Sequence, residues 1–510
     1  MQKYTPFFAS ALLMCVLLFI VYPHYQYYVD PDGTAYLTIS QRYANGDFQK
    51  AINGYWSPWS CWLTAGLINL GLQAIPASVI INATGAVGFL YISQSLFQHF
   101  GIVRQLEWLF CATLAFFLCY AIFWQSFNDL WECFFLLSGL RLLLDASFES
   151  KPVLWVLCGI TGTLAYFAKA YSFPFFILNT LCCTYFISKH NKARWLKISA
   201  VSIAVMILCS LPWIWLLHNK YGIWTTSTSG SLNMSWYLVG HPQWKEGIGL
   251  LLPPAYPDSP YYWEDPWFAN GATPHFWDSW HLLALQFLRI GLNIWKFIVS
   301  SFQLSVFFIF VAGYAKWALF WRRGVALSKD LKVLMLSFLL FTLGYLLVNF
   351  ESRYIWYMLP PGMVIGGLTL QNMKSAKWKN ILRLVFPVTF LIYPAWEMIN
   401  MYNKGADEHK IAQQLKQLNI HGTFTSNAQP GPGIQRIERL AYFSGYQLYS
   451  LSKQGASRQD ILKEMRRYHV NYYFILQPSD EKNLVDGQGQ AFPEISNGAI
   501  AGFKIFLVNP

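Results

Sequence analysis

Hydrophobic residues along this chain are gathered into long runs that are separated by short polar stretches. A helix needs about 20 mostly apolar residues to cross the hydrocarbon core of a bilayer. The stretch 59–74 is apolar too, but Pro58 and Pro76 bracket it closely, and we expect an interfacial helix there. The pattern predicts eleven crossing segments, at 6–22, 77–98, 106–124, 130–147, 153–168, 171–188, 198–217, 283–315, 331–349, 355–371 and 381–399.

Basic residues are clustered in short polar stretches at 189–197, 316–332 and 374–383. Cytoplasmic loops of membrane proteins carry such an excess of Lys and Arg. Eleven crossings that begin at a cytoplasmic N-terminus place all three clusters on one side, so charge and parity agree. We therefore expect the loops 23–58 and 218–281 and the tail to lie on the outer side.

The composition changes after about residue 400. The tail is rich in charged residues, and none of its apolar runs is long enough to cross a bilayer. Strand-like runs at 423–426, 440–443, 470–476 and 502–508 alternate with amphipathic helical patterns at 408–418 and 458–468. The sequence therefore predicts a membrane-embedded part, 1–400, with the outer loops 23–58 and 218–281, and a small outer α/β domain, 401–510.

The composition supports a mainly α, polytopic membrane bundle with outer interfacial helices. Of the 510 residues, 55% are hydrophobic and only 12% are Asp, Glu, Lys or Arg, whereas soluble domains carry about 25% charged residues. This excludes a disordered chain, a secreted disulfide scaffold and a soluble cytoplasmic enzyme. The net charge of +12 is spread over short loops, so we expect no nucleic-acid partner.

Two outer acidic sites are candidates for chemistry. Asp30 and Asp32 directly follow the first crossing segment, and a turn at Pro31 and Gly33 leads into a helical pattern. A carboxylate at a helix start lies near the positive end of the helix dipole, which keeps it ionised for use as a base or a cation ligand. The alternative is that either residue only caps the helix.

Asp129 lies in the second outer loop and could be no more than a helix start. If that loop lies close to the first, Asp129 and Asp32 would instead form a catalytic pair.

Three basic residues, Lys169, Lys220 and Arg353, fall on the outer side, where the positive-inside trend disfavours them. They either extend to lipid headgroups or bind the phosphate of a lipid substrate. The loop 218–281 is rich in Trp and includes Trp263-Glu264-Asp265-Pro266-Trp267. Such rings suit sugar binding or an aromatic belt. We favour a belt with a lid and assign no residue there.

Several short motifs occur along the chain in a defined order. These are Asp30-Pro31-Asp32-Gly33, Tyr55-Trp56-Ser57-Pro58-Trp59, Asp129 and Ser352-Arg353-Tyr354, the last followed by Pro360-Pro361. Together with the outer tail, this order resembles the C-type polytopic glycosyltransferase superfamily. The nearest branch is that of the bacterial protein-mannosyltransferases and aminoarabinose transferases. The resemblance covers about residues 1–400.

The resemblance implies roles for individual residues. Asp32 takes the place of the catalytic base, and Tyr36 matches a Tyr that follows it in the family motif. Gly33 replaces the usual Glu, so Asp30 is a candidate for the missing carboxylate. Asp129 matches the family's second-loop Asp, although Leu rather than Pro follows it. The implied substrate-binding residues are Tyr36, Lys169, Lys220, Arg353 and Tyr354.

The implied reaction is an inverting transfer of a hexosyl or pentosyl group from a polyprenyl phosphate to an acceptor hydroxyl. The acceptor class stays open between glycan, lipid and protein, and membrane lipids are expected partners. No cofactor is assigned, and a divalent cation stays open. The implied location is the bacterial inner (plasma) membrane, with the site and the tail facing the periplasm or exterior.

Other functions share part of this pattern. A polymerase, ligase or flippase for lipid-linked glycans would also need to bind a lipid phosphate. A secondary transporter is less favoured, because such proteins show internal repeats and charges at mid-depth, whereas the sequence shows no paired halves. A scaffold would leave the outer Asp, Lys and Arg residues without a purpose.

Overall fold

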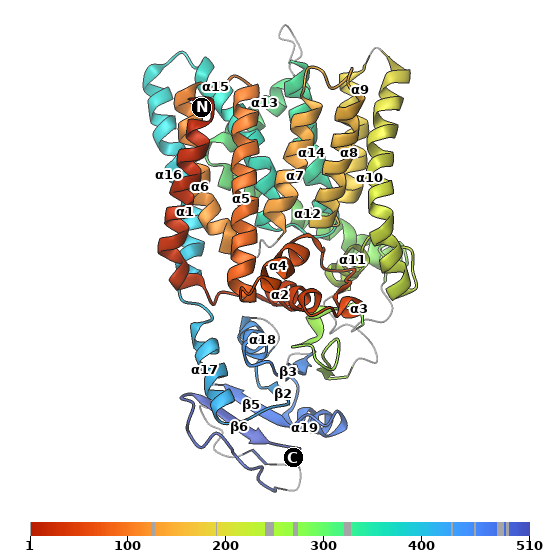
Figure 1. The fold of residues 1–510 in the computed structure, drawn as a ribbon, viewed down its shortest axis with the longest axis vertical. Helices are drawn as coiled ribbons and strands as arrows, with labels where there is room; N and C mark the ends of the chain where they lie inside the picture. Colours follow the sequence, from red (N-terminus) through yellow and green to blue (C-terminus); the bar gives the residue numbers. More distant parts are fainter. Residues whose placement is uncertain are drawn as a thin grey trace.

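The chain is a helical bundle with a small α/β unit at one end (Figure 1). The computed structural model describes residues 2–123, 128–189, 191–239, 249–268, 274–320, 328–429, 432–452, 455–476, 484–485 and 489–509. Long helices run side by side, and the N-terminus lies at the end of the bundle opposite the α/β unit. This confirms the predicted fold class, which is a mainly α membrane bundle with an α/β tail.

Seven apolar stretches of the described chain are long enough to cross a membrane, by length and composition. They are α1 (Thr5–Tyr25), α5 (Ala74–His99), α6 (Arg104–Phe123), α10 (Lys192–Tyr221), Trp280–Leu304, α14 (Lys329–Leu347) and Ala376–Gln417, which contains α16 (Ala376–Met401). Four other predicted crossings coincide with shorter helices: α7 (Asp129–Leu143), α8 (Pro152–Ala168), α9 (Ser172–Ile187) and α15 (Leu359–Asn372). A further short helix is α13 (Val306–Phe320). The protein is therefore a multi-pass membrane protein.

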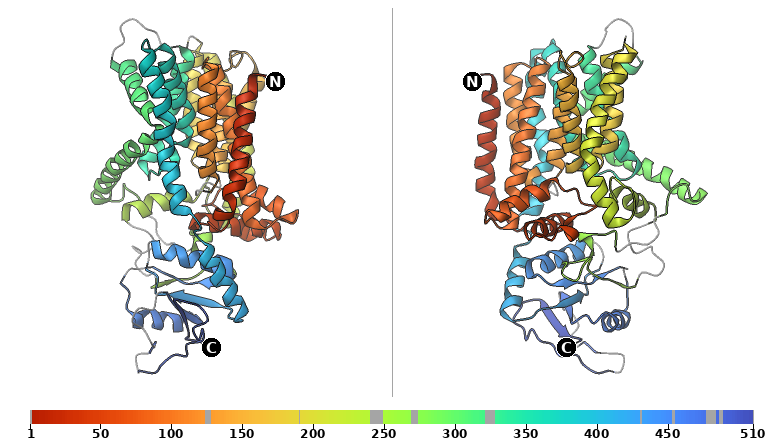
Figure 2. Two further views of the ribbon diagram at one scale, coloured as in Figure 1. Left: turned by 90° about the vertical axis from the view of Figure 1, so that its left-hand side faces the viewer. Right: turned by 45° about the vertical axis from the view of Figure 1, so that its right-hand side comes forward.

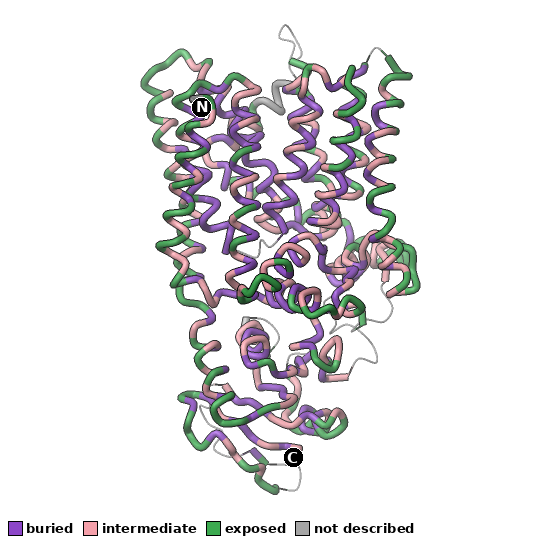
Figure 3. Tube along the Cα trace, viewed as in Figure 1, coloured by how far each residue is buried: buried purple, intermediate pink, exposed green. Residues whose placement is uncertain are grey.

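Burial divides the bundle into central and peripheral helices (Figure 3). In α6 most side chains are buried against neighbouring helices, whereas α1 exposes Phe8, Leu12 and Phe19. An apolar helix that is exposed along its length is stable where lipid rather than water surrounds it. The apolar runs of the sequence thus become a packed centre and a lipid-facing surface.

The predicted continuous segment 283–315 is wrong. The structure has α12 (Trp280–Ser301), a short 3₁₀ turn η4 (Phe302–Leu304) and α13 in its place, and Figure 2 shows α12 inclined away from the bundle. The break lies at Ser305, which has φ +60° although it is not glycine. Its hydroxyl forms a hydrogen bond with that of Thr389 on α16. A tertiary contact supports this break, so hydrophobicity alone does not reveal it.

Short helices form a layer across the end of the bundle that faces the α/β unit (Figure 1). They are α2 (Pro31–Ala44), α3 (Phe48–Ala51), α4 (Trp59–Asn69) and α11 (Ser229–Val239). The expected helix in 59–74 is α4, and it lies beside α2. The described residues of the basic clusters 189–197 and 374–383 lie at the opposite end of the bundle, as their grouping predicts. Which side of the membrane each end faces stays a prediction, and 321–327 of the third cluster lies outside the described residues.

The α/β unit follows α16 and contains a four-stranded sheet in the order β3-β2-β5-β6. The strands are β2 (Thr423–Ser426), β3 (Gln447–Leu448), β5 (Tyr472–Leu476) and β6 (Phe503–Leu507), and the helices are α17 (Ala406–Gln417), α18 (Pro432–Ser444) and α19 (Arg458–Arg467). β2 is parallel to β3 and β5, and β6 is antiparallel to β5.

One predicted strand of the tail is wrong, because Leu440–Phe443 belongs to α18. Ile437, Leu440 and Ala441 are all buried in the core of the α/β unit. Their spacing is that of one helix face, and a four-residue apolar run taken alone fits a strand equally well.

Arg42 on α2 holds the outer layer to the loop that precedes α12. Its Nη2 lies 3.1 Å from Glu264 Oε2, and its Nε also contacts Glu264. The same guanidinium pairs with Asp47 at 3.0 Å and with Asp258 at 3.1 Å. The Glu264 side chain is 1% exposed and that of Asp258 is 54% exposed. These two acids therefore give a matched comparison of a buried and an exposed partner.

Glu264→Gln is expected to destabilise the folded protein by about 3 kcal/mol, because it leaves a buried guanidinium without its buried counter-charge. Asp258→Asn removes an exposed pair and is expected to cost at most about 1 kcal/mol. Thermal unfolding of the purified variants in one detergent measures the difference. Equal losses of stability in both variants would contradict this account.

Candidate active site

A cavity of about 420 Å³ lies between the end of the bundle and the outer layer. Its walls come from α2, the loop 55–57, α7, the turn between α8 and α9, α11, and the end of α14 with the residues that follow it. The polar and aromatic side chains of its lining are Asp32, Tyr36, Tyr55, Trp56, Ser57, Asn128, Asp129, Lys169, Tyr171, Thr226, Ser227, Ser229, Asn233, Trp236, Tyr237, Trp263, Tyr345, Asn349, Glu351, Arg353 and Tyr354. Segments far apart in the sequence therefore meet at one site.

Asp32 faces this cavity from the first turn of α2. Pro31 occupies the first helical position, which suits its fixed φ, and Asp30 caps the helix. Asp32 Oδ1 accepts a hydrogen bond from the indole of Trp263 at 3.2 Å. Burial raises the pKa of Asp32 above its usual value, although the charge of Arg353 opposes that rise. A carboxylate with a raised pKa is suited to accept a proton.

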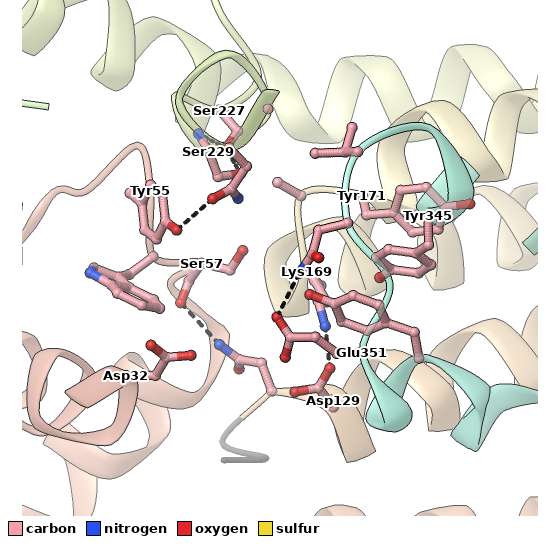
Figure 4. A pocket seen from close by; sticks show the side chains of 18 of the residues that line it. Asp32, Tyr55, Ser57, Asp129, Lys169, Tyr171, Ser227, Ser229, Tyr345 and Glu351 are labelled. Carbon is pink, nitrogen blue, oxygen red and sulfur yellow. Dashed lines mark hydrogen bonds and ion pairs between the residues drawn. The ribbon is translucent and has the colours of Figure 1, made fainter. Parts of the chain in front are cut away.

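Asp129 begins α7 on the opposite wall, and Figure 4 shows it beside Lys169 and across the cavity from Asp32. Lys169, in the turn after α8, forms an ion pair with Asp129 and lies 3.9 Å from Glu132. The neighbouring Asn128 accepts a hydrogen bond from the Ser60 amide at 3.1 Å. The start of α7 is thus attached to the outer layer.

Arg353 joins the two walls. It lies in η5 (Ser352–Met358), and its terminal nitrogens are 3.4 Å from Asp32 and 3.4 Å from Asp129. Its Nε donates to Glu351 at 3.0 Å. Two carboxylates repel each other at short range unless a cation lies between them. The expected convergence of Asp32 and Asp129 is found, and Arg353 mediates it.

Aromatic rings surround the cations. The ammonium of Lys169 lies 4.4 Å from the centre of the Tyr354 ring, which stacks on Tyr345 at 3.9 Å. A ring face attracts a cation and restricts its position. Tyr36, on α2, also lines the cavity. Tyr36, Lys169, Arg353 and Tyr354 are thus brought together as the sequence predicts.

Two predicted site residues, Asp30 and Lys220, lie elsewhere in the described structure. Asp30 is buried at the N-cap of α2, where its Oδ1 accepts from the Gly33 amide at 2.5 Å. Lys220, in the last turn of α10, pairs with Asp265 at 3.1 Å and donates to the carbonyl of Ile52. The geometry therefore favours the capping alternative for Asp30 and a structural ion pair for Lys220.

Sequence reasoning missed several residues of the lining. Trp263 contacts Asp32, and Glu351 contacts Arg353, yet neither was assigned. The available signals were weak. Trp263 precedes two acidic residues in an outer loop, and Glu351 stands two positions before Arg353. Tyr55 and Asn233 also line the cavity, and the Tyr55 phenol donates a hydrogen bond to Asn233 at 2.9 Å.

The described residues hold no group of three or more His, Cys, Asp or Glu side chains that could ligate a metal ion. Asp32 and Asp129 are both engaged by Arg353, which is not a metal ligand. These side chains do not fit a resident divalent cation, and the chemistry below uses none.

Comparison with known proteins finds similarity in structure but not in sequence. No protein-family model matches the chain, and no curated protein sequence matches it. ArnT from Cupriavidus metallidurans bound to undecaprenyl phosphate has 11% identity and a TM-score of 0.54, over 98% of this chain and 97% of that one. Archaeal oligosaccharyltransferase AglB from Archaeoglobus fulgidus, with an inhibitory peptide and a dolichol-phosphate, has 12% identity and a TM-score of 0.53, over 94% and 69%.

A third similar structure is the arabinofuranosyltransferase AftD from Mycobacteria, with 12% identity and a TM-score of 0.51. The match covers 99% of this chain and 41% of that one. At such identities the likeness shows a shared fold. The function has to be argued from the site itself.

Proposed function

We propose that this chain, which has the fold of the C-type polytopic membrane glycosyltransferases, is an inverting glycosyltransferase that uses a polyprenyl-phosphate sugar as donor. The observation that carries the proposal is a carboxylate, Asp32, that faces two cations across one cavity. Two structures of the same fold contain a polyprenyl or dolichyl phosphate, which supports this donor class. The sugar is a hexosyl or pentosyl group, and the acceptor is a hydroxyl of a glycan, lipid or protein.

In the proposed reaction Asp32 removes the proton from the acceptor hydroxyl. The acceptor oxygen then forms a bond to the anomeric carbon of the sugar, and the bond from that carbon to the phosphate oxygen breaks. Attack opposite the leaving group inverts the configuration. The products are the glycosylated acceptor and polyprenyl phosphate, and the proton remains on Asp32. General-base catalysis of this kind contributes typically about 10²–10⁴-fold to the rate.

Arg353 and Lys169 are placed to stabilise the leaving phosphate. Both cations are paired with carboxylates in the structure, so the donor phosphate would exchange with part of those pairs. As Asp32 takes up the proton it loses its charge, and its hold on Arg353 weakens. The guanidinium is then available to the phosphate at the moment when negative charge develops there. Fixed cations in a cavity with little water act strongly on such charge.

Orientation in the membrane follows from the same proposal. The outer layer that lines the cavity lies at the end of the bundle opposite the basic clusters, and such clusters mark cytoplasmic loops. We therefore place the cavity and the α/β domain, residues 401–510, on the outer side of the bacterial inner membrane. A lipid-linked donor fits this location, because it needs no soluble nucleotide sugar outside the cell.

Asp32→Asn is expected to lower sugar transfer by at least about 10²-fold, because the amide cannot accept the acceptor proton. The assay incubates purified protein with radiolabelled polyprenyl-phosphate sugars and candidate acceptors. Asp30→Asn is the control. Asn caps a helix as well as Asp does, so this variant is expected to stay within roughly ten-fold of wild type. Undiminished transfer by Asp32→Asn would remove Asp32 from the mechanism, and an equal loss in Asp30→Asn would return Asp30 to it.

The pH dependence of transfer has a predicted sign. The base must be deprotonated, so kcat/KM rises with pH through the pKa of Asp32, which burial raises above its usual value. The acid limb is therefore expected at a higher pH than the value of about 4 of an unperturbed Asp. Arg353→Gln removes the charge that lowers this pKa, and the limb moves to still higher pH. If the acid limb of kcat/KM falls at the same pH in Arg353→Gln as in wild type, a group other than Asp32 is titrating.

Arg353→Lys keeps the positive charge and tests the link that Arg353 forms between Asp32 and Asp129. A Lys ammonium cannot hold Asp32, Asp129 and a phosphate in the planar fork of a guanidinium. Loss of one charge-assisted hydrogen bond, of about 1.5–3 kcal/mol, is expected to reduce kcat/KM by about 10–100-fold. Arg194→Lys, on the exposed first turn of α10 at the other end of the bundle, is the matched control and should behave as wild type. Equal activity of the two variants would contradict the assigned role.

A further inference from the structure

The segment Gly249–Phe268, here called the clamp segment, belongs to both parts of the molecule. Its strand β1 (Leu251–Leu252) pairs antiparallel with β4 (Ser450–Leu451) of the α/β domain. The Leu448 amide donates to the carbonyl of Pro260 at 2.7 Å. Further along, the rings of Tyr261 and Tyr262 are buried in the core of the α/β domain together with Phe424 and Phe474. Backbone hydrogen bonds and buried side chains thus both attach the clamp segment to the α/β domain.

The next residues of the clamp segment are attached to the membrane-embedded part by two buried carboxylates. Glu264 pairs with Arg42 near the end of α2, as described above. Asp265 is completely buried and pairs with Lys220 at 3.1 Å. It also accepts hydrogen bonds from the phenols of Tyr221 at 2.9 Å and Tyr256 at 2.8 Å. Breaking buried pairs of this kind is costly, so the clamp segment is held in one position.

Between these attachments the clamp segment contacts the start of α2. The Tyr261 hydroxyl donates to the carbonyl of Pro31 at 2.7 Å, and the Trp263 indole donates to Asp32 Oδ1 at 3.2 Å. The Trp263 ring stacks on Trp236 with centroids 5.3 Å apart, and its carbonyl accepts from the Trp56 indole at 2.9 Å. The indole that meets Asp32 therefore has both its ring and its backbone fixed.

We propose that the C-terminal α/β domain positions the catalytic base: through the clamp segment it holds Trp263 against Asp32 and Tyr261 against the start of α2. This inference rests on the proposed function. With Trp263 on Oδ1 and Arg353 on Oδ2, the carboxylate is fixed in orientation by a donor on each oxygen. Trp263 and Tyr261 are positioning residues, which act on the acceptor only through Asp32.

Trp263→Phe removes the indole donor and keeps an aromatic ring. The hydrogen bond favours the ionised form of Asp32, so its loss raises the pKa of that carboxyl. The charged groups that act on Asp32 from the packed elements, Arg353, Glu351, Asp129, Asp30 and Glu438, are unchanged in this variant.

The acid limb of kcat/KM is expected to move up by about one pH unit, with a fall in kcat of roughly ten-fold. Trp277→Phe is the matched control, because Trp277 belongs to the same loop but is exposed, and it should leave both quantities as in wild type. A Trp263→Phe profile that matches that of wild type would overturn the proposal.

Tyr261→Phe tests whether the effect comes from the α/β domain. It removes the hydroxyl that reaches Pro31 and leaves the buried ring in place. We expect a fall in kcat of at least about three-fold with the acceptor KM unchanged, which corresponds to one neutral hydrogen bond. Combined with Trp263→Phe it should lose less than the product of the two effects, because both act through Asp32.

Tyr446→Phe is the control, since this buried hydroxyl of the same core has no hydrogen-bond partner in the described structure. A rise in acceptor KM with an unchanged kcat in Tyr261→Phe would overturn the proposal and make the domain an acceptor-binding unit.

A readout without substrate separates this inference from the proposed function. Hydrogen–deuterium exchange of the wild-type protein and the four single variants follows the amides at the start of α2. Faster exchange there in Trp263→Phe and Tyr261→Phe, but not in Trp277→Phe or Tyr446→Phe, is the expected result. If wild type transfers no sugar but the five proteins show this exchange pattern, the proposed function fails, and the link from the α/β domain to the start of α2 stands. Exchange that is identical in all five proteins overturns the link even if transfer is found. If Trp263→Phe does not fold, Tyr261→Phe decides.

Discussion

The bridge that Arg353 makes between Asp32 and Asp129 is the interaction on which the cavity depends. The three residues come from η5, α2 and α7, which are distant in sequence. Without a cation between them, the two carboxylates on facing walls would repel each other, and this repulsion would oppose the observed approach of the walls. With it, the walls are held at a defined separation, and in the proposed reaction the same guanidinium also binds the donor phosphate.

The bundle and the outer layer contribute differently to this site. Asp129 begins α7, Lys169 follows α8 and Arg353 lies in η5, all in the bundle, while the proposed base Asp32 lies on α2 in the outer layer. Hydrogen bonds within a short helix stabilise it little, so α2 needs tertiary support. That support comes from Arg42 at its far end and from the clamp segment at its start. Precise placement of a base is what makes its chemistry effective.

The shared fold and the site support the proposed function independently. Structures at 11–12% identity establish how the chain is folded, and several chemistries can occupy one fold. The roles proposed for Asp32, Arg353 and Lys169 are supported by distances and charges in this chain. In the proposed function the fold and the site both agree with a lipid-phosphate donor, because a donor of that kind needs cations beside a base in a cavity at the membrane surface.

Local patterns in the sequence determined the membrane bundle, the grouping of basic loops at one end and the α/β tail. Each of these depends on composition or periodicity within a single segment. Of the cavity residues, Asp32, Asp129, Lys169 and Arg353 stand out in the sequence as charged residues of outer segments, whereas Tyr36 and Tyr354 were assigned from the resemblance to a known family. Tertiary structure alone decided the rest. Ser305 breaks a hydrophobic run because Thr389 bonds to it, Lys220 lies beside Asp265, and Trp263 reaches Asp32 from 231 positions away. Such contacts depend on how segments that are distant in sequence pack against each other, and a pattern within one segment does not encode that packing.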